Sequence, residues 1–224
     1  MGGVLAEPAA SLTDLALGAV TLVLAVRLGR SPAVNGYWRV ALWWFGVAAL
    51  AGAVHHGVVV RWPQAAEVSW AVISVMVVVA VSFLLAATVA EVLGPGRSRA
   101  FWLLRSVGVV AYLIMAATGN AGVATILACE GITMVSVLIL WGWAAHQHHP
   151  LAGPVLLAIV ASGAAAGVKA LSPELLRPVG LDPTSAYHLA QIVGMVLLYV
   201  AVSSPQRGDL DTAAPATRRG YAVA

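Results

Sequence analysis

Seven long apolar stretches, separated by short polar breaks, run along the chain almost from end to end. They cover residues 11–28, 38–60, 68–92, 100–118, 121–143, 151–170 and 186–203. Each is close to the roughly 20 residues that a helix needs to cross the hydrocarbon layer of a membrane. The breaks contain proline or glycine, which end helices. The pattern therefore predicts an all-α, polytopic membrane protein built as a bundle of seven transmembrane helices.

The composition agrees with this prediction. Of the 224 residues, 61% are hydrophobic and only 9% are charged, with a mean hydropathy of +0.91. A soluble domain carries about 25% charged residues, so a water-soluble globular protein is excluded. We expect residues 1–203 to form one seven-helix domain and the polar residues 204–224 to form a flexible cytoplasmic tail. The net charge of +3 does not indicate nucleic-acid binding, because the basic residues stand at the ends of the apolar stretches.

The distribution of arginine predicts how the chain crosses the membrane. Arginines gather after the first and third stretches, at Arg27, Arg30 and Arg97 among others, and none precedes the first stretch. Basic connections stay in the cytoplasm, so the N-terminus faces out and the C-terminus faces in, across the plasma (cytoplasmic) membrane. On this topology Trp38 and Trp141 are expected at the inner interface, where tryptophan is enriched.

Several polar residues converge on the outer side of the predicted bundle. His55 and His56 end the second stretch, Glu67 begins the third, and His188 and Gln191 begin the seventh. Histidine with a carboxylate at one depth predicts a zinc site, in which an open position leaves room for a reactive water. Neighbouring residues on a helix point about 100° apart, so we prefer His56 and His188 as ligands, with either His55 or Glu67 as the third. Glu67 or Gln191 would then orient the water or the substrate. Interfacial hydrogen bonding by the histidines and helix capping by Glu67 are the structural alternatives.

Other polar residues inside the apolar stretches also need a reason, because burying charge in lipid is costly. Glu130 lies deep in the fifth stretch, and Lys169 ends the sixth, where it is expected to reach toward the interface. Glu130 and the outer histidines also support a second hypothesis, a non-enzymatic transporter, channel or ligand-binding membrane protein. Asp14 is interpreted as an N-terminal cap of the first helix, and Glu91 and Arg105 are expected to pair near the inner leaflet. A structural subunit without chemistry is a third hypothesis.

Two short motifs resemble the CREST superfamily, which includes alkaline ceramidases and adiponectin-receptor-type proteins. They are Gly52-Ala-Val-His-His-Gly57 and Tyr187-His-Leu-Ala-Gln191. The resemblance implies seven spans, a zinc cofactor near the outer leaflet, membrane lipids as partners, and hydrolysis of a lipid amide or ester. The chain has Gly52 where the family usually has serine and Glu67 where it usually has aspartate. His188 stands without the second histidine of the family's His-x-x-x-His pair.

Overall fold

The computed structural model describes residues 5–32, 34–120, 122–169, 172–176 and 181–204. These residues form helices and turns, with no β-strand among them. The helices are α1 (Pro8–Leu28), α2 (Gly36–Gly57), α3 (Pro63–Val92), α4 (Ser98–Ala117), α5 (Val123–His146), α6 (Ala152–Val168), α7 (Pro173–Leu176) and α8 (Pro183–Ser203), with a 3-10 turn η1 (Val59–Arg61) after α2. Of the predicted tail at 204–224, residues 205–224 lie outside the described residues.

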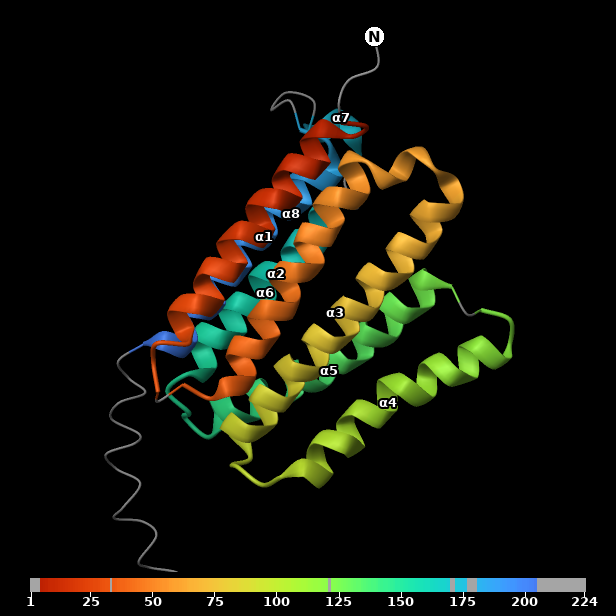
Figure 1. The fold of residues 1–224 in the computed structure, drawn as a ribbon. Helices are drawn as coiled ribbons and strands as arrows, with labels where there is room; N and C mark the ends of the chain where they lie inside the picture. The colour runs from red at the N-terminus through yellow and green to blue at the C-terminus, as the bar shows by residue number, and fades with distance from the viewer. Residues whose placement is uncertain (1–4, 33, 121, 170–171, 177–180, 205–224) are drawn as a thin grey trace, which may run out of the picture.

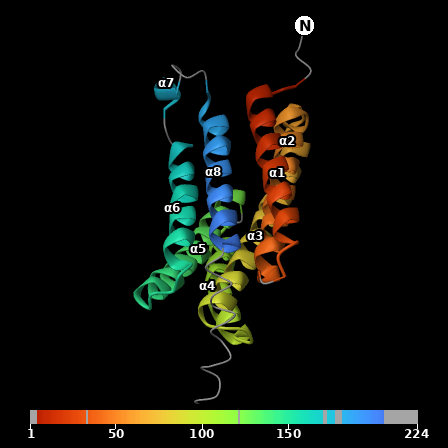
Figure 2. The ribbon, with the colours of Figure 1, turned by 90° about the vertical axis from the view of Figure 1, so that its left-hand side faces the viewer.

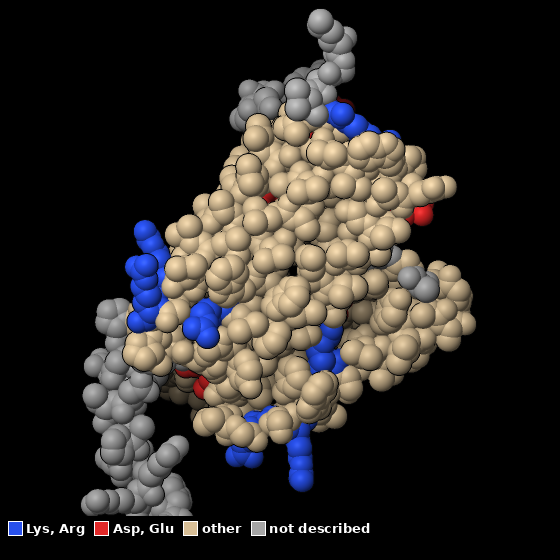
Figure 3. Space-filling view, viewed as in Figure 1, with Lys and Arg blue, Asp and Glu red and all other residues tan. Residues whose placement is uncertain are grey.

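The predicted all-α membrane fold agrees with these helices. In the described part of the chain, α1, α2, α3, α4, α5 and α8 are each long and apolar enough to cross a membrane. The sixth predicted span, 151–170, corresponds to α6, which is apolar but has only 17 residues, about 26 Å of helix. On the face drawn in Figure 3, uncharged residues cover most of the surface. The chain is therefore a helical bundle of the multi-pass membrane type.

Six of the helices follow one another around a closed ring. α1 packs against α2 and α8, α3 packs against α2 and α5, and α6 packs against α8 and α5 (Figures 1 and 2). α4 lies outside this ring and contacts mainly α5. Only Arg105 and Gly108 are buried on α4 among the described residues. The ring brings the first helix against the last, and this contact forms the candidate site.

The end of the bundle away from the N-terminus is a well-packed core. Trp38 and Trp141 are 1% and 0% exposed, and their ring centroids lie 6.3 Å apart. The indole N–H of Trp141 donates to Thr88 Oγ1 over 3.1 Å, and that of Trp38 donates to Glu91 Oε2 over 3.4 Å. These two tryptophans, predicted to lie at the inner interface, thus pack inside the bundle rather than on its surface. Hydrogen-bond partners on α3 satisfy their N–H groups, which allows large rings to be buried completely.

The start of α8 is fixed by a strong N-terminal cap. Asp182 Oδ1 accepts hydrogen bonds from the backbone N–H groups of Thr184 and Ser185, each over 2.9 Å. The Ser185 hydroxyl donates to the other carboxylate oxygen. Partial burial raises the pKa of Asp182, but these hydrogen bonds outweigh it and hold that pKa below its ordinary value. Pro183 follows as the first helical residue, a position that needs no N–H partner. The cap therefore sets where His188 stands in the second turn.

Candidate metal centre

Three helices bring Asp14, His56 and His188 together at the end of the bundle nearest the N-terminus. One possible ligand atom from each residue lies within 4.8 Å of the other two. The Nε2 atom of His188 is 3.3 Å from Asp14 Oδ1, and the Nε2 atom of His56 is 4.0 Å from Asp14 Oδ2. The side chains of Asp14 and His188 are each 7% exposed and that of His56 is 13% exposed. The cluster is thus shielded from solvent, and α1, α2 and α8 each supply one member.

Hydrogen bonds at Nδ1, the ring nitrogen that faces away from Asp14, orient both imidazoles. Glu7 Oε2 lies 2.5 Å from His56 Nδ1 and accepts a hydrogen bond from its N–H group. Thr13 Oγ1 lies 3.1 Å from His188 Nδ1, and the Thr13 hydroxyl donates its own proton to Ala9 O over 2.9 Å. The hydroxyl oxygen therefore accepts from the His188 ring. Each Nδ1 then carries the proton and each Nε2 keeps a lone pair, which faces the carboxylate between the rings.

This donor set fits a zinc ion. Two lone pairs that face a carboxylate repel it unless a cation or a proton lies between them. Ligands at about 2.1 Å on a tetrahedral zinc ion lie about 3.4 Å apart. The 3.3 Å between His188 Nε2 and Asp14 Oδ1 matches this spacing, and the three ligand atoms together lie within 4.8 Å of one another. A second hydrogen bond from each ligating imidazole to a carboxylate or another acceptor is the usual support for such ligands. Two histidines and one aspartate would leave a fourth position open.

A glycine makes room for the aspartate. A Cβ atom at Gly52 would lie 2.5 Å from Asp14 Oδ2, so any other residue there would displace the carboxylate. Beside Gly52, the hydroxyl of Ser11 on α1 donates to Ala53 O on α2 over 2.8 Å and ties the two helices together. A Cβ atom at Gly57 would lie 2.8 Å from Ser11 Oγ. Close approach of these two helices therefore depends on Gly52 and Gly57, and it positions Asp14.

Two of the predicted site residues lie apart from the cluster. His55 points toward α3, where its Nδ1 lies 3.2 Å from Ser69 Oγ and its ring stacks on Trp70 at a centroid distance of 5.0 Å. Adjacent helical positions differ by about 100°, so His55 and His56 face different neighbours. Glu67 is exposed near the start of α3 and is not among the residues that the described structure gathers into a possible metal site. The carboxylate that lies beside His56 and His188 is that of Asp14 on α1.

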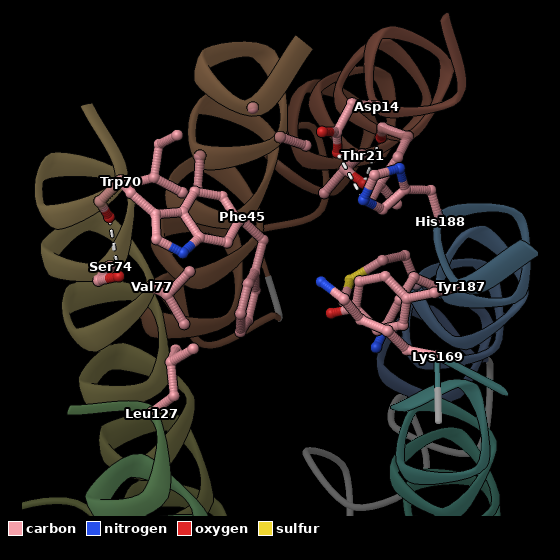
Figure 4. A pocket seen from close by; sticks show the side chains of 17 residues that line it. Asp14, Thr21, Phe45, Trp70, Ser74, Val77, Leu127, Lys169, Tyr187 and His188 are labelled. Atoms are coloured by element: carbon pink, nitrogen blue, oxygen red, sulfur yellow. Dashed lines mark hydrogen bonds and ion pairs between the residues drawn. The ribbon is translucent and has the colours of Figure 1, made fainter. Parts of the chain in front are cut away.

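Gln191 and Lys169 line a cavity of about 230 Å³ beside the cluster (Figure 4). Gln191 Nε2 donates to Ser162 O over 3.1 Å and so links α8 to α6. The wall of the cavity has both polar and apolar residues. The polar residues include Asp14, Lys169, Tyr187, His188 and Gln191, and the apolar ones include Phe45, Ile73, Val77, Leu127 and Met195. An amphiphilic molecule would match both parts.

Glu130 does not line this cavity. Arg105 Nη2 donates to Glu130 Oε1 over 2.8 Å, and Arg105 Nη1 donates to Thr133 Oγ1 over 2.9 Å. Both charged side chains are buried, at 7% and 8% exposure. The expected pairing of Arg105 with Glu91 is wrong, because α4 packs on α5 and turns Arg105 toward Glu130. The pair joins α4 to the ring of helices.

Sequence reasoning missed Asp14 and the two residues that orient the imidazoles. Asp14 was expected to cap the first helix, but α1 begins at Pro8, so Asp14 lies in the second turn. An aspartate that far inside an apolar helix would itself have been a signal, because lipid disfavours it. Glu7 and Thr13 carried no such signal, since both stand near a helix end.

The orienting hydrogen bonds lead to a prediction on metal affinity. We expect Glu7→Ala and Thr13→Val each to weaken zinc binding about 10–100-fold, because each frees one imidazole to rotate. Competitive titration of the purified protein against a chromophoric zinc chelator measures the change. Glu67→Ala is the matched control, since it removes a carboxylate outside the cluster. Equal zinc affinity of the Glu7→Ala and Glu67→Ala variants would contradict the assignment.

Comparison with known proteins adds the family. No curated protein and no solved structure matches the chain. A family model matches residues 9–207, a range that contains Asp14, His56 and His188 but not Glu7. The chain therefore belongs to the family that this model describes, the family of unknown function DUF6962.

Proposed function

We propose that this protein is a multi-pass membrane hydrolase that cleaves a lipid amide or ester with a zinc ion held by Asp14, His56 and His188. The observation that supports it best is the pair of imidazoles whose Nδ1 atoms are engaged outside and whose Nε2 atoms face one carboxylate. Three protein ligands with an open fourth position are typical of catalytic zinc, whereas structural zinc sites are closed by four.

The cavity supports a lipid substrate. Asp14 and His188 line it directly, so a reacting group in the cavity would lie beside the metal ligands. The apolar wall, with Phe45 and Met195, would bind an acyl chain, and Gln191 and Tyr187 offer polar contacts to the head of the molecule. Zinc bound there would lower the pKa of a water toward neutrality and polarise the substrate carbonyl. In the net reaction a C–O bond to water oxygen forms, the C–N or C–O bond of the lipid breaks, and the leaving group gains a proton.

The topology that suits this function has seven spans, with α6 as the short sixth. The arginine bias then puts the N-terminus outside and the site near the outer leaflet of the plasma membrane. On the face drawn in Figure 3, most visible Lys and Arg atoms lie in the half away from the N-terminus, which supports that orientation. Lipids of the outer leaflet would reach the cavity from the side.

Kinship with the CREST superfamily is part of this proposal. His56 and His188 come from the second and the last helix, as the resemblance implies. The acid would come from α1 rather than from the third span. Gly52, which stands where the superfamily usually has serine, leaves the space that the Asp14 carboxylate occupies. The change to glycine and the change in the source of the acid would then be linked.

The transporter hypothesis has less support. It relied on Glu130 as a charge along a path, but Glu130 pairs with Arg105 and is absent from the cavity lining. A buried carboxylate that is paired in this way contributes to helix packing rather than to a polar pathway.

Hydrolysis by the purified protein tests the proposal. Zinc-loaded protein in an uncharged detergent is incubated with N-oleoylglycine, N-oleoylethanolamine or monooleoylglycerol, and released oleate is measured by mass spectrometry. We expect release from at least one of them that needs zinc and is lost in His188→Ala but kept in Glu67→Ala. Zinc-loaded wild type that releases no oleate from any of the three would contradict the proposed activity.

A further inference from the structure

Lys169 is the only lysine in the chain, and the other eleven of its Lys and Arg residues are arginines. It directly follows α6 and lines the same cavity as Asp14 and His188 (Figure 4). Its Nζ atom lies 5.4 Å from the ring centroid of Tyr187 and 5.9 Å from that of Trp70. Aromatic faces at such distances attract an ammonium group. The charge is therefore held at the polar end of the cavity, although the residue as a whole is exposed.

Lys169 is the cation in the lining of this cavity, and it acts on Asp14 electrostatically without forming an ion pair with it. Asp14 and Lys169 are the charged residues in its lining, and the Asp14 carboxylate faces the two imidazoles. Among the described residues, no carboxylate oxygen forms an ion pair with Lys169 within 4.0 Å. A divalent ion at the cluster would make the polar end more positive still. Such a surface favours a ligand that brings a negative charge.

Lys169 lies beside the three candidate metal ligands and is not one of them. Tyr187, over which the ammonium lies, precedes His188 on α8, and adjacent helical residues point about 100° apart. An anion bound by Lys169 would therefore lie beside the cluster, while the apolar wall takes the acyl chain. A choline-type headgroup is disfavoured, because the lysine already occupies the aromatic faces that would attract it and repels a second cation.

We propose that Lys169 is a specificity-determining residue that binds an anion in the headgroup of the lipid. The substrate class is then a lipid amide with a negatively charged head, as in an N-acyl amino acid. That the bound lipid is a substrate rests on the proposed hydrolase activity. The anion site itself does not depend on zinc or on hydrolysis.

A matched pair of ligands tests it. N-oleoylglycine and N-oleoylethanolamine share the chain and the amide and differ in a carboxylate against a hydroxymethyl group. Their dissociation constants are measured at pH 7.5 in an uncharged detergent, with zinc-loaded protein and with protein freed of zinc by EDTA. We expect wild type to bind the anionic amide about tenfold more tightly in both states, the size of a hydrogen bond to a charged group.

Three variants complete the experiment. Lys169→Gln is expected to bring the ratio of the two dissociation constants close to one without changing the affinity for N-oleoylethanolamine. Lys169→Arg keeps the charge and is expected to keep the preference. Arg61→Gln is the control, because it removes a positive charge near the same end of the bundle from a residue that does not line the cavity.

Several results would overturn the inference. One is a preference that survives in Lys169→Gln, and another is a preference that disappears from wild type when zinc is removed, since the metal would then bind the carboxylate. Failure of both amides to bind wild type would overturn it as well. A protein without zinc or hydrolysis that still shows the lysine-dependent preference would end the hydrolase proposal and leave the anion site standing.

Discussion

Replacing His188 by alanine is expected to lower the zinc content of the purified protein from about one ion per chain to nearly none. Changes in the hydrogen-bond partners of a ligand already cost about 10–100-fold in affinity, so loss of a ligand should cost more. His56→Ala and Asp14→Asn are expected to act in the same way. Metal analysis by mass spectrometry, after purification without a nickel column, measures the stoichiometry.

The neighbouring histidine is the control for this experiment. His55→Ala removes an imidazole one residue from His56, but that ring faces Ser69 and Trp70, so zinc content should stay near that of wild type. Gly52→Ala provides a stricter test, because it keeps all three ligands and displaces the Asp14 carboxylate through a Cβ atom at 2.5 Å. We expect it to lose zinc like His188→Ala. Zinc lost in His55→Ala and kept in His56→Ala would show that the wrong imidazole has been assigned.

Breaking the buried ion pair on α4 and α5 should have the largest effect on stability. Arg105→Met or Glu130→Leu leaves one charge buried without its partner, which costs about 3–5 kcal/mol of the free energy of unfolding. Replacing both residues at once is expected to recover most of that loss, since two apolar side chains suit a lipid-embedded contact. Unfolding in increasing mole fractions of dodecyl sulfate, followed by circular dichroism, measures these changes.

The same double variant distinguishes a structural pair from a functional one. Because neither residue lines the cavity, the double variant should keep its zinc and any hydrolytic activity. Trp141 is a useful spectroscopic reference for the packing of α5. It is buried in the core at the end of the bundle opposite the cluster. A double variant that is stable yet inactive would contradict the structural role and would revive Glu130 as part of a pathway.

The helices themselves could be predicted well because the length of an apolar stretch is a local property. The predicted stretch 100–118 corresponds to α4 at Ser98–Ala117, and 186–203 corresponds to α8 at Pro183–Ser203. Proline and glycine marked the breaks, and Gly94 and Gly96, with φ of +92° and +86°, turn the chain after α3. The order of helices around the ring was not predictable in this way, because it depends on contacts between distant segments.

The site was only partly accessible to the same reasoning. His56 and His188 were predicted to share a site because they lie at the same expected depth in the membrane. The structure brings these residues together. Depth does not determine which side of a helix a residue occupies, so Glu67 was included although it is exposed at the start of α3. Asp14 was missed because its role depends on where α1 begins and on the absence of a side chain at Gly52 on another helix.

Because its three residues come from α1, α2 and α8, the cluster exists only after the last helix has been inserted. A growing chain that has reached residue 182 contains Asp14 and His56 but no His188. Capture of an ion would then be the closing step of biogenesis, joining the two ends of the ring. The proposed lipid hydrolase would in this way stay inert throughout synthesis and gain its reactivity only once its helices are assembled.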